Sequence, residues 1–213
     1  MCPEPLTEQQ EAFRLQMIRF HYRHGFAPTY DEMVREFGFK SKAHAAHYVQ
    51  QLEAKGYLRR KPGSARAIEL LDRRFSVPFC GKVSAGKGIS FTDPQGSVEV
   101  PPDLFPPSDE MYAVEVSGNS LMDALIRDGD LLLVVKADRV ENGQLAVLKF
   151  PSPAFAEGET VCKRFFHHKT LVELRSENPN YSARYLPAEE VQVQGKVVGV
   201  IRSELRGSLP FAS

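Results

Sequence analysis

The spacing of the hydrophobic residues changes once along this 213-residue chain, near residues 73–76. Before that point apolar residues recur every three or four positions, which is typical of amphipathic helices. After it they gather in short β-type runs separated by Gly, Pro and Asp. The sequence therefore predicts an α+β protein with a helical domain over residues 1–72, a linker at 73–76, and a mostly antiparallel β domain over residues 77–213.

The first 56 residues carry start and stop signals for three helices. Thr7 and Thr29 each stand three residues before a Gln or Glu, which is the spacing of a capping box. Ser41 can cap the third helix, and each helix is followed by a glycine that can end it: Gly25, Gly38 and Gly56. The second and third helices are joined by a short turn that bears a glycine, so we expect a helix-turn-helix.

A β-hairpin with strands at residues 57–60 and 66–70 and a turn at 61–64 would make this a winged helix-turn-helix. In such a domain the third helix enters the major groove of double-stranded DNA, and the wing lies on phosphates. The candidate DNA contacts at the start of that helix, away from its apolar face, are Ser41, Lys42, Ala43, His44, Ala46 and His47. The candidate phosphate contacts on the wing are Arg59, Arg60 and Lys61.

The distribution of charge favours the same interpretation, although the whole chain is neutral. Residues 1–75 hold 13 Lys and Arg against 9 Asp and Glu, a net +4, and the remainder carries the opposite net charge. Within residues 40–66, seven Lys and Arg accompany one acidic residue, Glu53. Such a basic stripe is typical of a surface that binds nucleic acid. Charge alone would also fit a solvated surface face, and a winged domain can bind protein. The pattern of the second domain is needed to decide between these functions.

No metal ion, cofactor or membrane segment is expected. Two histidine pairs have the i, i+3 spacing of a helix face, but neither has the further ligand or carboxylate that a metal site needs: His21 with His24, and His44 with His47. The longest aliphatic run, residues 131–135, is far shorter than the ~20 residues that span a bilayer.

The cysteines and the N-terminus indicate the compartment. Cys2, Cys80 and Cys162 are scattered and have no CxxC spacing, which is typical of a protein in a reducing compartment. The first residues lack the basic start and the apolar stretch of a signal peptide. The content of apolar residues, 42%, and of charged residues, 25%, is ordinary for a globular protein. We therefore expect a cytoplasmic protein.

The second domain has the pattern of an all-β fold. Its candidate strands are residues 98–100, 112–116, 131–135, 144–150, 160–166, 171–174 and 191–202. Many short strands without intervening long helices predict a twisted antiparallel sheet or a partial barrel.

Ser120 is the candidate nucleophile of this domain. A β run ends at Val116, the chain turns over residues 117–119, and Ser120 begins a short helical piece. A hydroxyl in that position stands beside backbone N–H groups that can hold an oxyanion. The same residue types also occur in plain turns, so the segment alone does not identify an active site.

Lys163 is the candidate base that would activate the serine. Strand alternation puts Lys163 on one face with Val161 and Phe165, while Cys162 and Arg164 point the other way. Desolvation by the two apolar neighbours would lower the pKa of the amine, and a neutral amine can accept the proton of a serine. The alternative is that the long side chain extends to water.

Two histidines offer a second choice of base. His167 and His168 fall at the end of the same strand, next to Lys169. No Gly-x-Ser-x-Gly motif surrounds Ser120, which would be expected of a serine–histidine hydrolase of the α/β type. We therefore favour Lys163.

These motifs together resemble the LexA-type repressors over essentially the full length of the chain. In the first domain the resemblance lies in residues 6–10, 28–29, 37–39 and 52–56. In the second domain residues 77–86 resemble the family's cleavage-site region, residues 116–121 with 128–130 its nucleophile segment, residues 160–164 its lysine strand, and residues 198–202 its closing strand.

The resemblance implies a second domain that dimerises the protein and cleaves its own chain as a serine–lysine peptidase. It implies Ser120 as nucleophile, Lys163 as base, and the bond between Ala85 and Gly86 as substrate. Small residues at 84–86 could enter a narrow cleft, although they would also suit a plain flexible turn. A homodimer of this kind would bind operator DNA, repress DNA-damage (SOS) genes, and be inactivated when a RecA-type filament on single-stranded DNA stimulates cleavage.

The sequence departs from the family pattern in two places. Asn119 stands where members often carry Met, and residues 42–47 differ from the recognition helix of the best-known members, so the operator sequence does not carry over. Two other functions stay open at this point. One is a DNA-binding regulator whose second domain only dimerises or senses a partner. The other is a peptidase acting on other proteins, as signal peptidases do, which leaves the winged helix-turn-helix unexplained.

Overall fold

The computed structural model describes residues 5–61, 66–71, 74–83, 94–150 and 160–202. The chain divides into two compact units, residues 1–75 with 99–107, and residues 76–98 with 108–213. The finer boundaries expected from the sequence, at residues 72 and 77, stay predictions.

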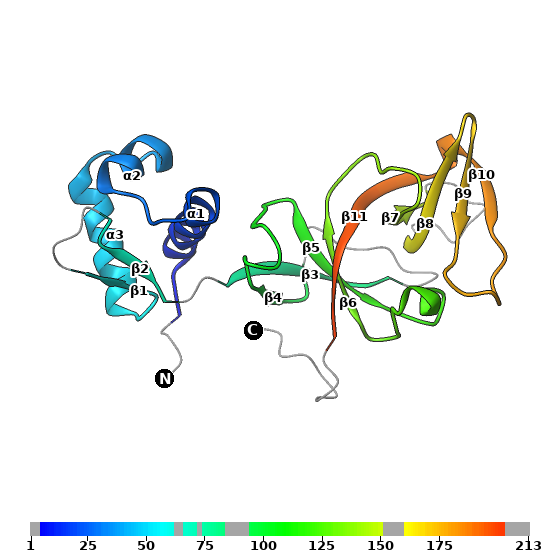
Figure 1. The fold of residues 1–213 in the computed structure, drawn as a ribbon, viewed down its shortest axis with the longest axis horizontal. Coiled ribbons are helices and arrows are strands. Elements are labelled where there is room, and N and C mark those ends of the chain that lie inside the picture. The colour runs from blue at the N-terminus through cyan, green and yellow to red at the C-terminus, as the bar shows by residue number, and fades with distance from the viewer. Residues whose placement is uncertain (1–4, 62–65, 72–73, 84–93, 151–159, 203–213) are drawn as a thin grey trace. The chain divides into compact units, whose positions relative to one another are not determined.

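The first unit contains the predicted winged helix-turn-helix (Figure 1). Its helices are α1 (Glu8–His24), α2 (Tyr30–Phe37) and α3 (Lys42–Ala54). The wing is the antiparallel pair β1 (Leu58–Arg60) and β2 (Ile68–Leu70).

The predicted helix caps are confirmed. Thr7 with Gln10 and Thr29 with Glu32 form complete capping boxes at the starts of α1 and α2, so each box satisfies two backbone N–H groups that the helix leaves free. The hydroxyl of Ser41 accepts a hydrogen bond from the His44 N–H at the start of α3 (3.2 Å).

The core of this unit forms where the apolar faces of the three helices and β1 meet. Its buried members are Phe13, Met17, Met33, Ala45, Val49, Leu52 and Leu58. Phe13 packs edge-on against Phe37, Phe39 and Tyr48, with ring centroids 5.2–6.2 Å apart. This packing fixes the angle at which α3 presents its opposite, exposed face.

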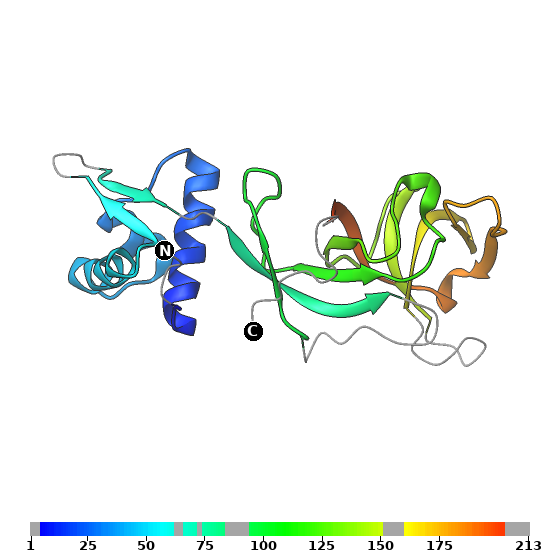
Figure 2. The same ribbon diagram turned by 90° about the horizontal axis from the view of Figure 1, so that it is seen from below.

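Among the described residues of the chain, nine strands form one mixed sheet in the order β10-β9-β8-β7-β11-β6-β5-β3-β4 (Figures 1 and 2). The strands are β3 (Phe75–Val83), β4 (Ser97–Val100), β5 (Met111–Val116), β6 (Leu131–Val135), β7 (Gln144–Lys149), β8 (Thr160–His168), β9 (Leu171–Arg175), β10 (Arg184–Pro187) and β11 (Gln192–Ile201). Two short 3₁₀ helices, Met122–Ala124 and Ala188–Glu190, interrupt the strands. The mostly antiparallel β prediction is correct, with one parallel pair, β3 and β5.

Two strands of this sheet were not predicted from the sequence. β3 contains Pro78 and Gly81, and both residue types argue against a strand interior. It forms nevertheless because alternate residues are buried and because it pairs with β5, which lies nearly thirty positions further along. β10 is four residues long and carries no apolar alternation that would distinguish it from a loop.

Strands β7 and β8 each contribute side chains to two cores. Val147 and Cys162 are buried in one core with residues of β3, β5 and β6. Ala146, Val161 and Phe165 pack into the other, with residues of β9, β10 and β11. The expectation that Val161 and Phe165 share a face opposite Cys162 is therefore confirmed, and Lys163 lies between them on β8.

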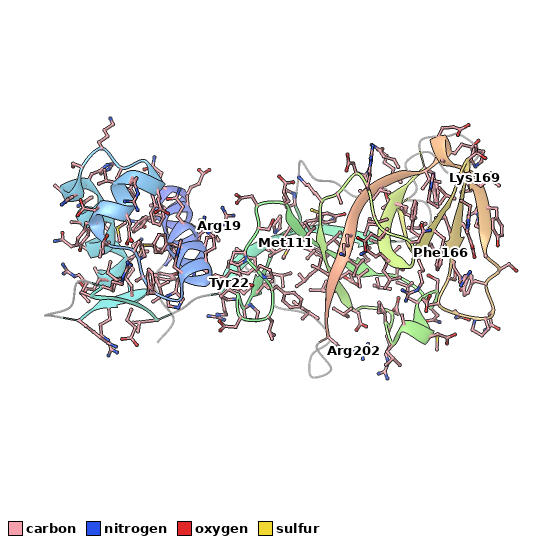
Figure 3. The ribbon with its side chains drawn as sticks, turned by 45° about the horizontal axis from the view of Figure 1, so that its top comes forward. Arg19, Tyr22, Met111, Phe166, Lys169 and Arg202 are labelled. Carbon is pink, nitrogen blue, oxygen red and sulfur yellow. The ribbon has the colours of Figure 1, made fainter. Side chains whose placement is uncertain are left out.

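An ion pair between a buried aspartate and an exposed arginine closes the turn that precedes β6. Asp130, only 3% exposed, accepts hydrogen bonds from Arg202 Nε (2.8 Å) and Nη2 (2.6 Å) at the end of β11, where Figure 3 labels Arg202. The Arg127 N–H also donates to this carboxylate (2.8 Å). Chiefly because of the hydrogen bond from Arg202, the pKa of Asp130 lies below its ordinary value.

We expect Arg202→Gln to lower the free energy of unfolding by about 1–3 kcal/mol at neutral pH, because it leaves the Asp130 charge with a weaker partner. A lowered carboxyl pKa stabilises the fold above the unfolded-state pKa of about 3.9 and ceases to do so as the pH falls through the folded-state value. The difference between the two proteins should therefore shrink toward about pH 3.

Urea unfolding at several pH values measures both effects. Arg139→Gln, which changes an exposed arginine, is the matched control. If the difference in the free energy of unfolding stays constant from pH 7 to pH 3, the ion pair is not the source of the destabilisation.

Candidate functional site

Ser120 and Lys163, 43 positions apart in the sequence, line one cavity of about 460 Å³ in the second unit. Four segments form its walls: the end of β3 at Val83, the turn 117–120, β8 at residues 161–163, and the segment 176–184. The structure thus brings together the two residues that the sequence singled out as nucleophile and base.

The turn that carries Ser120 is built by hydrogen bonds on both sides. β5 ends at Val116, and Gly118 then adopts a φ of 90°, a left-handed conformation that favours glycine. The Gly118 N–H donates to Asp128 Oδ1 (2.7 Å), and the Ser117 N–H donates to the Val83 carbonyl (3.2 Å). Ser120 follows, half-buried, directly before the 3₁₀ helix Met122–Ala124.

Lys163 is half-buried on β8, and its Nζ lies 5.7 Å from the centre of the Tyr181 ring. Its neighbour Cys162 is buried, and burial raises the pKa of that thiol to about 12, an effect that the positive charges of Lys163 and Arg164 partly offset. Cys162 therefore stays protonated at neutral pH and does not compete with Ser120 as a nucleophile.

The two histidines considered as alternative bases do not line this cavity. His167 and His168 are exposed at the far end of β8, and His168 Nε2 lies 3.1 Å from Glu173 Oε2. His167 is four residues beyond Lys163, about 13 Å along an extended strand. The geometry favours Lys163.

The segment 176–184, which forms another wall of the cavity, was not predicted from the sequence as part of the site. The side chain of Asn178, only 8% exposed, donates to the carbonyl of Asn119 (2.8 Å), directly before Ser120. The backbone carbonyl of Glu177 accepts a hydrogen bond from the Asp123 N–H (2.7 Å). The side chain of Glu177 pairs with Arg164 on β8. The polar cluster Asn178-Pro179-Asn180 is typical of a turn, and nothing local indicates that it reaches a serine 58 positions away.

The predicted cleavage bond between Ala85 and Gly86 lies outside the described residues. The nearest described residue, Val83, is the last residue of β3 and lines the cavity together with Ser120 and Lys163.

In the first unit, the candidate DNA contacts of α3 lie at its N-terminal end. Ala46 is half-buried, and the other members of the set are exposed: Ser41, Lys42, Ala43, His44 and His47. Lys42 Nζ pairs with Asp31 Oδ1 (2.8 Å), and His47 Nε2 lies 2.9 Å from the amide nitrogen of Gln51. Their contact with DNA stays a prediction.

The basic residues of the wing have acidic partners, and one of them, Glu69, lies outside the count over residues 40–66. Glu69 pairs with Arg59 (2.6 Å) and Lys61 (2.9 Å), and Arg60 pairs with Glu53 (2.6 Å). The hydrogen bonds from Arg59 and Lys61 lower the pKa of Glu69 to about 2. The wing therefore presents its cations already associated with carboxylates, and phosphates would have to displace them.

The described residues contain no group of three or more His, Cys, Asp or Glu side chains that could hold a metal ion. None of the described helices is long and apolar enough to cross a membrane.

Comparisons with known proteins match both units. Residues 3–67 match the LexA DNA binding domain, and residues 78–198 match the Peptidase S24-like family. LexA repressors from Thermosipho melanesiensis, Syntrophobacter fumaroxidans and Desulfitobacterium hafniense are 33%, 34% and 34% identical to this chain. The alignments cover 92%, 96% and 93% of this chain and 97%, 98% and 98% of those proteins.

A winged helix-turn-helix followed by an S24-like domain defines a DNA-binding protein with a serine peptidase domain of the self-cleaving type. The similarity over nearly all of both sequences narrows this class. The chain belongs to the LexA repressor family. It is therefore an SOS transcriptional repressor whose peptidase domain cleaves its own chain, and the family implies DNA binding and a dimer.

We expect Glu69→Gln to tighten binding to DNA of any sequence by roughly two- to fivefold, because Arg59 and Lys61 would no longer exchange a carboxylate for a phosphate. Titration of labelled duplexes at several salt concentrations measures the gain, which should shrink as salt rises. Glu189→Gln changes the net charge equally on the second unit and serves as the control. Equal gains in the two variants would show that net charge, not the wing, is responsible.

Proposed function

We propose that Ser120 and Lys163 form the dyad that cleaves the bond between Ala85 and Gly86 of the same chain. The observation that carries this proposal is the shared cavity: the serine, the lysine and Val83, two positions before the proposed bond, all line it.

The connection between β3 and the turn of Ser120 supports cleavage within one chain. Val83 pairs with Val116 in the parallel ladder, and its carbonyl accepts the hydrogen bond from the Ser117 N–H. Only two Cα–Cα steps separate Val83 from Ala85, a distance of at most about 7.6 Å. A bond in the same chain as the nucleophile needs no diffusional encounter with it, so presentation of the bond in the reactive geometry limits the rate.

The chemistry follows from the two side chains. The neutral amine of Lys163 takes the proton from the Ser120 hydroxyl as Oγ attacks the carbonyl carbon of Ala85. The resulting ammonium returns this proton to the nitrogen of Gly86, the peptide bond breaks, and an ester joins Ala85 to Ser120. Water, deprotonated by the same amine, hydrolyses the ester and leaves a carboxylate on Ala85.

The turn also supplies candidates for holding the oxyanion. The N–H groups of Ser117 and Gly118 donate to Val83 and Asp128, so the candidates on the turn are the N–H groups of Asn119 and Ser120. Backbone donors fixed in this way stabilise the developing charge without reorganisation.

Cleavage would end repression by separating two linked functions. In a dimer each protomer places one α3 on a half-site, and the linkage raises the overall affinity beyond that of one contact. Cutting between Ala85 and Gly86 would release the DNA-binding part from the dimerising part. We further propose that this occurs in the cytoplasm on a RecA-type filament, which accelerates cleavage by binding the cleavable conformer in preference. A hundredfold acceleration requires about 2.7 kcal/mol of differential binding.

We expect Ser120→Ala and Lys163→Ala each to give folded, DNA-binding protein that stays intact, both at alkaline pH and with an activated filament. The parent should yield fragments ending at Ala85 and beginning at Gly86, at a rate that rises with pH because only the neutral amine accepts a proton. Mass spectrometry after each incubation identifies the junction. The loss in Lys163→Ala should be at least about a hundredfold.

Three results would contradict this assignment. A parent that never cleaves itself would indicate a sensor or dimerisation domain instead. Cleavage that survives in Lys163→Ala would transfer the role of base to His167 or His168. A different fragment junction would remove Ala85 and Gly86 as the site.

The recognition helix and the wing should respond differently to truncation. His47→Ala or Lys42→Ala should weaken operator binding by ~1–3 kcal/mol and relax discrimination between sequences, as expected for contacts to base edges. Lys61→Ala should weaken binding about equally for operator and random DNA. Footprinting with both kinds of duplex distinguishes the two classes, and identical footprints for parent, Lys42→Ala and His47→Ala would mean that α3 does not read the bases.

A further inference from the structure

Tyr181 is the aromatic residue that faces the proposed base. It is 50% exposed, it lines the cavity with Ser120 and Lys163, and its ring centre lies 5.7 Å from Lys163 Nζ. This separation falls within the ~6 Å over which an ammonium is attracted to the face of an aromatic ring.

Hydrogen bonds and an ion pair link the backbone around Tyr181 to both halves of the dyad. Its N–H donates to the carbonyl of Asn178 (3.1 Å), whose side chain donates to the carbonyl of Asn119 beside the nucleophile. The adjacent Glu177 pairs with Arg164, the residue after Lys163 on β8. Motion of the serine turn or of β8 would therefore carry Tyr181 with it.

An aromatic face distinguishes the two protonation states of a lysine. The negative face of the ring attracts the ammonium and has no comparable interaction with the neutral amine. General-base catalysis needs the neutral amine. A ring in this place therefore favours the unreactive state of Lys163.

Other charged groups act on the same amine. Among the described residues lining the cavity, the titratable or charged ones besides Lys163 are Cys162, Tyr181 and Arg184. Cys162 is a neutral thiol at neutral pH, and the positive charge of Arg184 acts against the ammonium. On the neighbouring segments Glu177 pairs with Arg164, and Asp128 accepts the hydrogen bond of Gly118.

We propose that Tyr181 is a positioning residue that favours the protonated state of Lys163 and so slows self-cleavage at neutral pH. This inference rests on the proposed dyad of Ser120 and Lys163. Cleavage then has two requirements. The scissile bond has to enter the cavity, and the amine of Lys163 has to lose its proton against the attraction of the ring.

The pH profile of self-cleavage tests this role. In Tyr181→Leu the midpoint of the profile should move to lower pH, cleavage near pH 7 should be roughly two- to fivefold faster, and the alkaline plateau should change little. Tyr181→Phe keeps the aromatic face and should behave like the parent. Tyr185→Leu removes an exposed tyrosine that does not line the cavity and is the matched control.

A second measurement separates this inference from the proposed function. In uncleavable Ser120→Ala protein with ¹³C-labelled lysines, the Lys163 signal is assigned by its loss in Lys163→Arg and then titrated. Adding Tyr181→Leu should lower the pKa of Lys163, whether or not the parent cleaves itself. An unchanged pKa, or a lowered alkaline plateau with an unmoved midpoint, would overturn the inference and assign Tyr181 to binding the cleavage segment. A parent that fails to cleave at any pH refutes only the dyad, because the titration still decides the role of Tyr181.

Discussion

The hydrogen bond from the Ser117 N–H to the Val83 carbonyl joins the two segments on which the proposed chemistry of the second unit depends. It continues the parallel pairing of β3 with β5, so the chain leaving β3 starts beside the turn that carries Ser120. The ion pair of Lys82 with Glu115 (2.6 Å) reinforces this end of the ladder. Sheet formation itself thus places the end of β3, two residues before the proposed cleavage bond, beside the turn that carries Ser120, at the cost of a non-local pairing.

The same contrast between local and non-local interactions decides what the sequence could predict of the fold. The caps at Thr7, Thr29 and Ser41 involve residues three positions apart, and the amino-acid types alone predict them correctly. A strand such as β6 can be recognised in the sequence because it is an apolar run. Four of its five residues are buried. β3 was missed because Pro78 and Gly81 weaken its local pattern, while the pairing with β5 that stabilises it leaves no trace within the strand.

The site divides in a similar way. Ser120 and Lys163 could be proposed because a strand–turn–helix piece and a lysine among apolar strand residues are local patterns, and because the resemblance to a family singled them out. Asn178 and Tyr181 could not, since each contacts a residue of another element that is distant in the sequence. The buried side-chain amide of Asn178 donates a hydrogen bond to the Asn119 carbonyl, which would otherwise lack this partner. The loop that carries Asn178 therefore helps to position Ser120.

The ion pairs of the first unit differ from these contacts, because a charged side chain at the surface can exchange one partner for another. Arg59, Lys61 and Glu69 are exposed, so their pairing contributes little to stability and is weakened further by salt. When a phosphate replaces the carboxylate of Glu69, loss of the ion pair offsets part of the attraction between the cations and the phosphate. The wing therefore binds DNA of arbitrary sequence more weakly than it would with unpaired cations. If α3 reads the bases as proposed, discrimination then depends more on its exposed N-terminal end, and the packing of Phe13 against Phe39 and Tyr48 holds this helix in place. A repressor that is destroyed by its own peptidase benefits from this arrangement, since the released DNA-binding part would keep only a weak hold on non-operator DNA.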